Sequence, residues 1–460
     1  MNFRNGAQRF RGNFMIFSNI KMLDSDFSVR EHMYVQTKDE KIIYIGTTMP
    51  KKNSADEEVY DGTNRFLMNG FFNAHCHVPM TILRGYGEGL SLQDWLFTKI
   101  FPFEAKLTAE DIYWTSKLGA MELISSGCAS ISEMYSKIAS IAKSLDECGL
   151  KANICNGITK FDRDESGFKD TYALRDVIET GIYKSENEKN TQGQTCSRIK
   201  LDYGIHSEYL SSSGICERVA RECREGGYNV HVHLSETEME HKESMERNKG
   251  KTPAQYFEAS GILGGQVQFA HCVYVTEEDE ELLKKSGSFL IHNPSSNLKL
   301  GSGIAPVKRW VEKGLNVCIG TDGASSNNNL DMLEEIHMAA MLCRGASKDA
   351  NAVSVKEIVK MATLNGALAQ GRTDCGTIKV GNRADIIVFS LEAPHMQPDF
   401  DTLANIVFSA QNSDIVLNMI DGRVVYRDGN FAFIDRARVY KEVNARLKRI
   451  LGELESQKGE

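Results

Sequence analysis

The stretch FLMNGFFNAHCH at residues 66–77 carries the first indication of the fold. Residues 66–74 are mostly apolar, as in a buried strand, and His75 and His77 follow at the end of that strand. Because side chains two positions apart on a strand point to the same face, both imidazoles are expected to aim at one point. Two charged imidazoles would repel each other there, so the pair indicates a metal site.

Short apolar strands alternate with longer segments of helical spacing from this stretch onward. The alternation is typical of βαβ units and a parallel sheet. Eight strands are predicted, at residues 66–74, 129–134, 151–159, 199–206, 228–234, 267–271, 289–293 and 315–321. Crossover helices are expected at residues 109–126, 138–147 and 276–286. The predicted fold class is therefore α/β, with a (β/α)₈ TIM barrel.

Both ends of the chain are predicted to be β-rich. Strand-like stretches occur at residues 13–20, 33–46, 384–391, 415–420 and 423–433. Neither end has enough strands for a sandwich alone, so the two are expected to combine into one small composite β-sandwich domain. The predicted domains are residues 1–65 and 376–435 for this domain, 66–375 for the barrel and 436–460 for a C-terminal helix. The charged run 185–197 is expected to be a surface loop.

The composition is that of an ordinary globular protein, with 41% hydrophobic and 25% charged residues in a chain of 460. A net charge of −8 argues against nucleic acid or an anionic membrane as the main partner. No stretch has the ~18 consecutive apolar residues of a membrane helix. The 11 cysteines never form C-x-x-C, which favours reduced thiols and a cytoplasmic location.

Further polar residues fall where later strands are predicted to end. His233 ends the fifth strand, with Glu236 three residues later; His271 ends the sixth, and Asp322 follows the eighth. Active sites of such barrels lie at the C-terminal ends of the strands, so these side chains are expected to join the two imidazoles of the first strand. Three imidazoles and one carboxylate suit a divalent ion such as zinc.

Two of these assignments have an alternative. His231 has the same strand parity as His233, which is favoured as the ligand because a glutamate follows it at catalytic reach. Asp322 could instead cap a helix that starts within residues 324–330. Two more histidines are interpreted as structural, His292 and His337.

Several motifs occur together along the chain: GFFNAHCHVPMTILRG at 70–85, Trp95-Leu96 with Pro102-Phe103-Glu104, HNPSSNLKLGSGIAP at 292–306, and GTDGASSNN at 320–328. Together they resemble the 5-methylthioadenosine/S-adenosylhomocysteine deaminases of the amidohydrolase superfamily. The resemblance extends over nearly the whole chain, because residues 362–367 and 376–385 also look like that family's barrel exit and return strand. Triazine hydrolases and other cyclic-amidine hydrolases share much of this pattern.

The resemblance implies a metal-dependent hydrolase that deaminates an aminated heterocycle. The implied substrate is an adenine nucleoside such as adenosine or 5-methylthioadenosine; a triazine, a guanine-type base or another cyclic amidine is the alternative. A third possibility, an inactive barrel used in assembly, would be expected to lose metal ligands, and this chain keeps them. The resemblance further implies a homo-oligomer with one divalent ion per subunit, Zn²⁺ or alternatively Fe²⁺. The implied ligands are His75, His77, His233 and Asp322.

The same resemblance implies roles for the remaining candidates. Glu236 would protonate the ring nitrogen beside the reacting carbon, Asp322 would pass the proton of water to the departing ammonia, and His271 would orient that water. Glu104 would accept hydrogen bonds from the ribose hydroxyls, and His206 would contact the substrate.

One departure from the family concerns substrate charge. In the resembling deaminases, two arginines hold the carboxylate of S-adenosylhomocysteine, whereas this chain has Asn156 at the first position and, near the second, Phe168. The sequence therefore predicts a preference for an uncharged substrate. Three cations close by in sequence could compensate from a loop, namely Lys160, Arg163 and Lys169.

Overall fold

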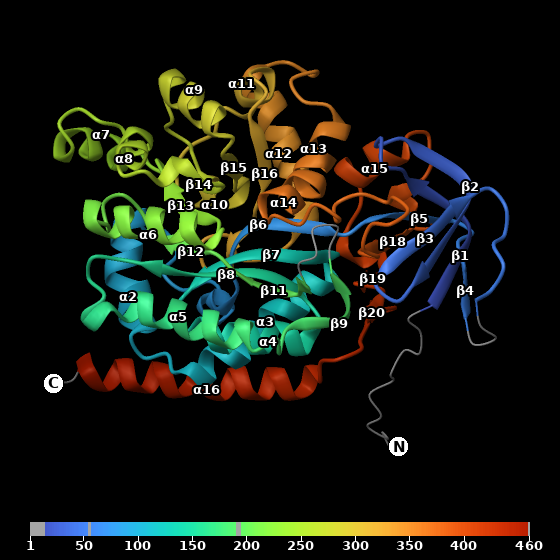
Figure 1. The fold of residues 1–460 in the computed structure, drawn as a ribbon, viewed down its shortest axis with the longest axis horizontal. Helices are drawn as coiled ribbons and strands as arrows, with labels where there is room; N and C mark the ends of the chain where they lie inside the picture. Colours follow the sequence, from blue (N-terminus) through green and yellow to red (C-terminus); the bar gives the residue numbers. More distant parts are fainter. Residues whose placement is uncertain (1–13, 54–56, 190–194, 459–460) are drawn as a thin grey trace.

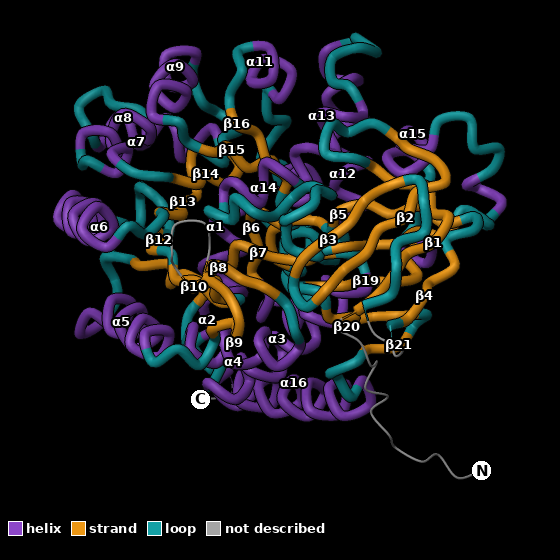
Figure 2. The backbone as a smooth tube through the Cα atoms, turned by 45° about the vertical axis from the view of Figure 1, so that its right-hand side comes forward, coloured by secondary structure: helices purple, strands orange, loops and turns teal. Residues whose placement is uncertain are grey.

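The computed structural model describes residues 14–53, 57–189 and 195–458. Their largest sheet is parallel, has ten strands and curls into a barrel (Figures 1 and 2). Its strands are β6 (Phe71–His77), β7 (Cys128–Tyr135), β8 (Lys151–Ile158), β11 (Ile199–Leu201), β12 (Tyr203–Ile205), β13 (Val230–Leu234), β14 (Val267–His271), β15 (Phe289–His292), β16 (Asn316–Ile319) and β17 (Asp322–Gly323). The short β17 follows β16 and pairs with β6 through Asp322 and Cys76, which closes the barrel.

The predicted barrel is confirmed, but its first strand differs from the prediction. Residues 66–74 contain parts of two strands, β5 (Arg65–Asn69) in the other sheet and β6 in the barrel. The chain changes sheets at Gly70, where an added Cβ would lie 2.8 Å from the Cβ of Ala129. An apolar run shows that a segment is buried, and does not show against which sheet it is buried.

Helices cover the outside of the barrel, and the three predicted crossovers are present. They are α3 (Ala109–Ser125), α4 (Ile138–Cys148) and α9 (Glu277–Ser286). The first and last begin with capping boxes at Thr108 and Thr276, in which the threonine hydroxyl and an aspartate three residues later satisfy backbone N–H groups. In the described part of the chain, no helix has both the length and the apolar character to cross a membrane.

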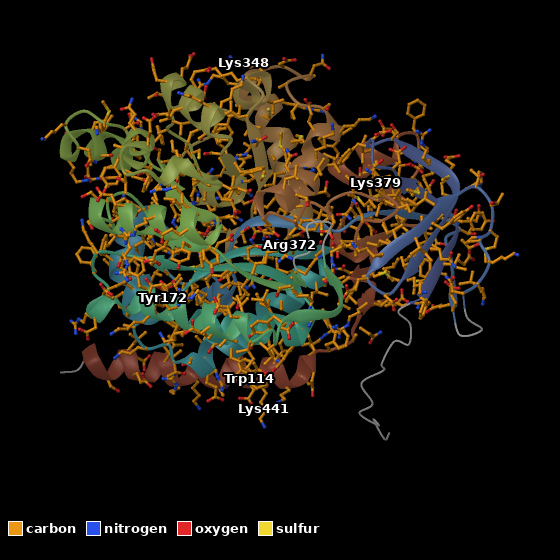
Figure 3. All side chains as sticks on the ribbon, viewed as in Figure 1. Trp114, Tyr172, Lys348, Arg372, Lys379 and Lys441 are labelled. Atoms are coloured by element: carbon orange, nitrogen blue, oxygen red, sulfur yellow. The ribbon has the colours of Figure 1, made fainter. Side chains whose placement is uncertain are left out.

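The terminal helix α16 (Arg436–Lys458) lies along α3, as Figure 1 shows. Arg449 Nη2 is 2.5 Å from the carboxylate of Asp111, which is in the first turn of α3. Trp114, which is labelled beside the terminal helix in Figure 3, faces that helix. Arg438 and Arg446 lie over its ring, at 5.0 and 5.6 Å from the centroid. These contacts hold the end of the chain against the barrel.

The interpretation of residues 185–197 as a plain surface loop is wrong. The segment contributes to an antiparallel pair formed by β9 (Lys184–Lys189) and β10 (Thr195–Ser197). A hairpin is held by backbone hydrogen bonds, so a charged composition does not prevent it.

The two ends of the chain form a second sheet of nine strands, as expected for one composite domain. The N-terminal part contributes β1 (Phe14–Leu23), β2 (Val29–Lys38), β3 (Lys41–Gly46), β4 (Glu58–Asp61) and β5; the C-terminal part contributes β18 (Ile386–Ser390), β19 (Ile415–Ile420), β20 (Arg423–Arg427) and β21 (Asn430–Phe431). Antiparallel pairing of β5 with β18 joins the two parts.

Successive side chains of β18 point into two different apolar cores, so this strand connects the sheet to the barrel. Ile386 and Val388 lie in the apolar core of the terminal sheet, whereas Ile387 and Phe389 lie in the large core shared with the barrel. Strand β18 is therefore buried on both faces, and the terminal sheet is packed directly against the barrel that carries the candidate site.

Candidate metal centre and active site

A cavity of about 230 Å³ opens where the parallel strands end. Its polar base is formed by His77, His233, Glu236, His271 and Asp322. Each of these side chains lies at or just beyond the C-terminal end of a barrel strand, as predicted from their spacing. Chemically capable residues from four different segments of the chain therefore meet in one site.

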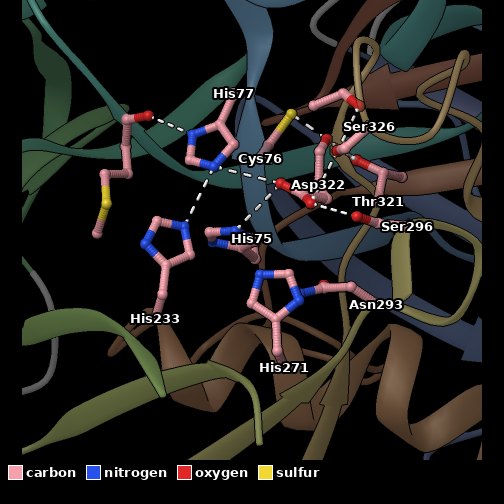
Figure 4. Close-up of polar contacts among 12 residues, drawn as sticks. His75, Cys76, His77, His233, His271, Asn293, Ser296, Thr321, Asp322 and Ser326 are labelled. Atoms are coloured by element: carbon pink, nitrogen blue, oxygen red, sulfur yellow. Dashed lines mark hydrogen bonds and ion pairs between the residues drawn. The ribbon is translucent and has the colours of Figure 1, made fainter. Parts of the chain in front are cut away.

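The histidines of β6 and β13 turn their ring nitrogens toward a common centre (Figure 4). His77 Nδ1 donates to the Met134 carbonyl at 2.5 Å, and His233 Nδ1 donates to the His206 carbonyl at 2.6 Å. In the neutral form of both rings the two Nε2 atoms would have lone pairs, and they lie 3.3 Å apart. Two facing lone pairs repel unless a proton or a metal cation lies between them.

His75 and Asp322 lie at the same centre as His77 and His233. His75 Nε2 is buried without a hydrogen-bond partner among the described residues and lies 3.4 Å from Asp322 Oδ1. The ligand atoms of His75, His77 and His233 all lie within 4.8 Å of one another, as do those of His75, His271 and Asp322. Neutral imidazole nitrogens and a carboxylate oxygen are donors that suit a divalent ion, so the residues present fit such a group.

The electrostatics favour the neutral ring at two of the histidines. Burial lowers the pKa of His75 to about 3 and lowers that of His233 well below its usual value. Burial would also lower the pKa of His77, but the hydrogen bond and charge of Asp322 outweigh it and raise that pKa to about 9. The site therefore attracts one positive charge, which a divalent ion would supply in place of the proton.

Asp322 is held by two serine hydroxyls. Ser296 and Ser326 donate to its Oδ2 at 2.6 and 2.8 Å, so Oδ1 is directed toward the histidines. The alternative in which Asp322 caps a helix is wrong, because the next helix, α12 (Met332–Ser347), begins ten residues later and has Asp331 as its N-cap. The Asp322 backbone has a φ of 60°, which turns the chain out of the strand direction at this point.

Glu236 and His271 lie beside the convergent histidines and Asp322. Ser302 Oγ donates to Glu236 Oε1 at 3.0 Å, and Glu236 Oε2 lies 3.8 Å from His271 Nε2. Burial raises the pKa of Glu236. His271 Nδ1 donates to Asn297 Oδ1 at 2.8 Å, so its Nε2 faces the cavity. The pair can hold and move a proton at the base of the cavity.

Glu240 also lines the cavity, and the sequence analysis did not identify it as a residue of the site. Its carboxylate accepts the backbone N–H groups of Ser235 at 3.1 Å and Glu236 at 2.8 Å. Ser235 has a φ of 46°, so the turn that presents Glu236 is left-handed and is held by these two bonds. The T-x-x-E pattern at Thr237–Glu240 could have marked Glu240, although only as a helix cap.

Glu104 and His206 both line the cavity. Glu104 ends α2 (Phe101–Glu104) and accepts a very short hydrogen bond from the hydroxyl of Tyr135, the last residue of β7. The ring of His206 lies against that of His233, with centroids 4.9 Å apart, and burial lowers the pKa of His206 to about 4. No motif in the sequence pointed to Tyr135.

The part of the cavity near β8 has no arginine at the positions where the sequence predicted none. Asn156 lines the cavity and donates through Nδ2 to Asp170 Oδ2 at 2.7 Å, whereas Phe168 is buried outside the lining, under the guanidinium of Arg218 at 3.8 Å. The three nearby cations, Lys160, Arg163 and Lys169, are exposed and do not line the cavity. Among the described residues that line it, none is a lysine or an arginine.

The two histidines interpreted as structural lie outside the lining. His292, on β15, is buried, and His337 packs edge-on against Phe408 with centroids 6.1 Å apart. His231, the alternative ligand, is buried behind His75, with its Nε2 2.8 Å from His75 Nδ1. His233 is therefore the histidine of β13 that reaches the cavity.

Comparisons with known proteins agree with this geometry. A family profile described as the amidohydrolase family matches residues 66–425. A 5-methylthioadenosine/S-adenosylhomocysteine deaminase of Caldanaerobacter subterraneus subsp. tengcongensis is 36% identical over 440 residues, which are 95% of this chain and 98% of that protein. A 5'-deoxyadenosine deaminase of Methanosarcina barkeri is 37% identical over 423 residues, which are 92% of this chain and 94% of that protein.

A solved structure shows the same similarity in three dimensions. The crystal structure of an adenosine deaminase from Xanthomonas campestris with bound zinc superimposes with a TM-score of 0.86 at 25% identity. The match covers 95% of this chain and 98% of that one. The whole arrangement of barrel and terminal sheet is thus shared.

Proposed function

This chain belongs to the amidohydrolase family, and on that premise we propose that it hydrolyses the exocyclic C–N bond of an adenine nucleoside and releases ammonia. The observation that carries this proposal is the similarity, over more than nine tenths of the chain, to relatives named as deaminases of such nucleosides. The convergent histidines and carboxylates at the base of the cavity supply the groups that this reaction needs.

The proposed metal ligands are His75, His77, His233 and Asp322. The lone pairs of the first three face one centre, and Asp322 Oδ1 lies 3.2 and 3.4 Å from the Nε2 atoms of His77 and His75. The nitrogen-rich donor set favours Zn²⁺, with Fe²⁺ as the alternative. Such an ion supplies Lewis acidity, which makes water nucleophilic at neutral pH.

The chain's own residues would move the protons. Glu236 would donate to the ring nitrogen beside the carbon that bears the amino group; its buried carboxyl has a raised pKa and thus retains a proton more readily. Its Oε1 is held by Ser302, which leaves Oε2 as the proton-carrying atom on the side of His271. In exchange for the amino group the ring carbon gains oxygen, and the products are a ring carbonyl and ammonia.

Asp322 and His271 would handle the attacking water. Asp322 Oδ1 lies at the centre of the histidines, where it would take a proton from water and pass it to the departing amine. His271, fixed through Nδ1 by Asn297, would orient the same water with its Nε2. His206, whose burial favours the neutral ring, lines the cavity and would contact the substrate there.

The cavity walls support an uncharged substrate. Much of the lining is apolar and includes Leu92, Trp95, Leu96, Ile100 and Leu300. Among the described residues that line the cavity, none is a lysine or an arginine, so no guanidinium or ammonium group there would pair with the carboxylate of S-adenosylhomocysteine. We therefore propose adenosine, 5-methylthioadenosine or 5'-deoxyadenosine as the class of substrate. The cytoplasmic location and the homo-oligomeric state stay predictions from the sequence.

Ammonia release tests the function directly. The purified protein, loaded with Zn²⁺ or Fe²⁺, is given adenosine, 5-methylthioadenosine, 5'-deoxyadenosine, S-adenosylhomocysteine, guanine, cytosine and a triazine in separate assays. We expect ammonia from the uncharged adenine nucleosides, with Glu236→Gln as the inactive control. Turnover of guanine or the triazine alone would contradict the proposal, and a metal-free, inactive protein would support a role in assembly.

A further inference from the structure

Glu335 is a buried carboxylate outside the cavity lining that joins two segments of the chain. It lies in the first turn of α12, and its side chain is 0% exposed. Its Oε2 accepts the backbone N–H of Ser295 at 3.2 Å, and its Oε1 accepts the side-chain amide of Asn327 at 2.8 Å. The first donor belongs to α10 (Pro294–Lys299) and the second to the loop that follows β17. Glu335 therefore connects α10 with that loop.

Helix α10 carries two side chains that hold groups of the candidate site. Ser296, the residue after Ser295, donates to Asp322 Oδ2 at 2.6 Å, and Asn297 Oδ1 accepts the Nδ1 hydrogen of His271 at 2.8 Å. The N–H of Ser295 is in the first turn of α10, where no carbonyl of the same helix can accept it. The carboxylate of α12 supplies that acceptor, so it fixes the start of the helix from which both side chains project.

The loop after β17 also holds Asp322. Ser326 donates at 2.8 Å to Asp322 Oδ2, the oxygen that Ser296 contacts as well (Figure 4). The next residue, Asn327, donates through Nδ2 to the Thr321 carbonyl at 2.8 Å in addition to its bond with the buried carboxylate. The two serines that hold one oxygen of Asp322 thus come from two segments, and both segments are bound to the same side chain of α12.

We propose that Glu335 is a positioning residue, which sets the direction of the Asp322 carboxylate by holding the two segments that carry its serine donors. The inference rests on the proposed function, in which Asp322 binds the metal and takes a proton from water. Ser296 and Ser326 both donate to Oδ2, which leaves Oδ1 for these roles. If either segment moved, one of the two serine bonds would be lost and the carboxylate could rotate away from the histidines.

The chemistry of the carboxyl group suits this role in either protonation state. Burial raises the pKa of Glu335 to about 8, and the hydrogen bonds from Ser295 and Asn327 act in the opposite direction. Each oxygen of a carboxyl group keeps a lone pair whether or not the group carries a proton, so both bonds can persist. An amide of the same shape has one acceptor oxygen and one NH₂ donor, and it can hold only one of the two segments.

The test compares Glu335→Gln with the wild type, since glutamine keeps the size of the side chain and releases one segment. We expect the Kd of Co²⁺, titrated into the metal-free full-length protein and followed by visible absorption, to rise about 10- to 100-fold. In the holoenzyme, kcat for an adenine nucleoside should fall by a similar factor with KM nearly unchanged, because Glu335 does not line the cavity. Glu334→Gln is the matched control, since Glu334 lies in the same turn of α12 and is exposed.

A mutant cycle separates positioning from a general contribution to folding. If Glu335 acts through the serines, Glu335→Gln should add little to the Co²⁺ Kd of a protein that already carries Ser296→Ala and Ser326→Ala. An equal loss of affinity in both backgrounds would overturn the inference, and so would wild-type affinity and kcat in Glu335→Gln itself.

A second variant covers the case in which Glu335→Gln lowers Tm too far for titration. Asn327→Ala removes one of the two donors and leaves the carboxylate bound to α10, so it should weaken Co²⁺ binding through the same serine contacts. Wild-type affinity in Asn327→Ala would then overturn the inference. Absence of ammonia from every nucleoside would overturn the proposed function, whereas the Co²⁺ titrations would still decide the role of Glu335.

Discussion

The Nδ1 atom of His75 lies 2.8 Å from the Nε2 atom of His231, and both rings are buried. If His75 binds a metal through Nε2, its Nδ1 must carry the proton and His231 must accept it. His231 would therefore fix the tautomer of a ligand from behind.

His231→Phe keeps a ring of similar size and removes the acceptor. We expect metal affinity, measured by competition with a chelator, to fall about 10- to 100-fold. His231→Gln retains an acceptor and should lose less. Equal affinity in the wild type and the phenylalanine variant would show that His231 is only a packing residue.

The second prediction concerns the ligands themselves. His75→Ala or Asp322→Ala should lose tightly bound metal and nearly all activity, because each removes one donor of the proposed centre. Together with His271 these two residues form a set whose ligand atoms lie within 4.8 Å of one another. Metal analysis of the purified variants measures the first effect and ammonia release the second. A variant with full activity and no metal would refute the assignment of the centre.

The third prediction separates proton transfer from metal binding. Glu236→Gln preserves the bond with Ser302 but cannot carry a proton, so kcat should fall by about 10²–10⁴-fold while the metal stays bound. Normal turnover would mean that Glu236 has only a structural role in its turn. Glu238→Gln, on the exposed start of α7 (Glu238–Arg247), is the matched control.

The fourth prediction concerns Glu240, which holds the backbone N–H groups of Ser235 and Glu236. Glu240→Ala frees the left-handed turn and should lower kcat about 10-fold or more, with little effect on KM, because Glu236 loses its alignment. Glu240→Gln keeps one acceptor and should recover part of the rate. The exposed Glu243, changed to Gln on the same helix, controls for the loss of charge. A change in KM alone would contradict this positioning role.

The fifth prediction concerns the charge of the substrate. Two lost charge-assisted bonds of ~1.5–3 kcal/mol each would lower kcat/KM for S-adenosylhomocysteine about 10²-fold or more relative to 5-methylthioadenosine. A new arginine at Asn156 should reverse part of this loss, but Asp170, 2.7 Å from the Asn156 amide, would pair with it. The test therefore combines Asn156→Arg with Asp170→Asn and measures kcat/KM on both substrates.

The charge prediction has a clear contrary outcome. If the wild type used S-adenosylhomocysteine as well as it uses the uncharged nucleosides, the prediction would be wrong. The exposed cations that follow β8 would then be the residues to change next, namely Lys160, Arg163 and Lys169.

Much of the site follows from the sequence because strand geometry is local. Because side chains alternate along a strand, His75 and His77 lie on one face. The C-terminal ends of parallel strands meet at one edge of a barrel, so His233, His271 and Asp322 had to approach these two histidines. The same reasoning predicted the barrel strands and the joining of the two chain ends.

Tertiary structure alone decided the features that depend on which neighbour a residue meets. His231 and His233 share a strand face, and only the packing of β13 beside β6 places the first behind His75 and the second in the cavity. The pairing of Tyr135 with Glu104 depends in the same way on how α2 folds over the end of β7. Periodicity describes which way a side chain points, whereas the partner it reaches depends on the distances between elements far apart in the chain.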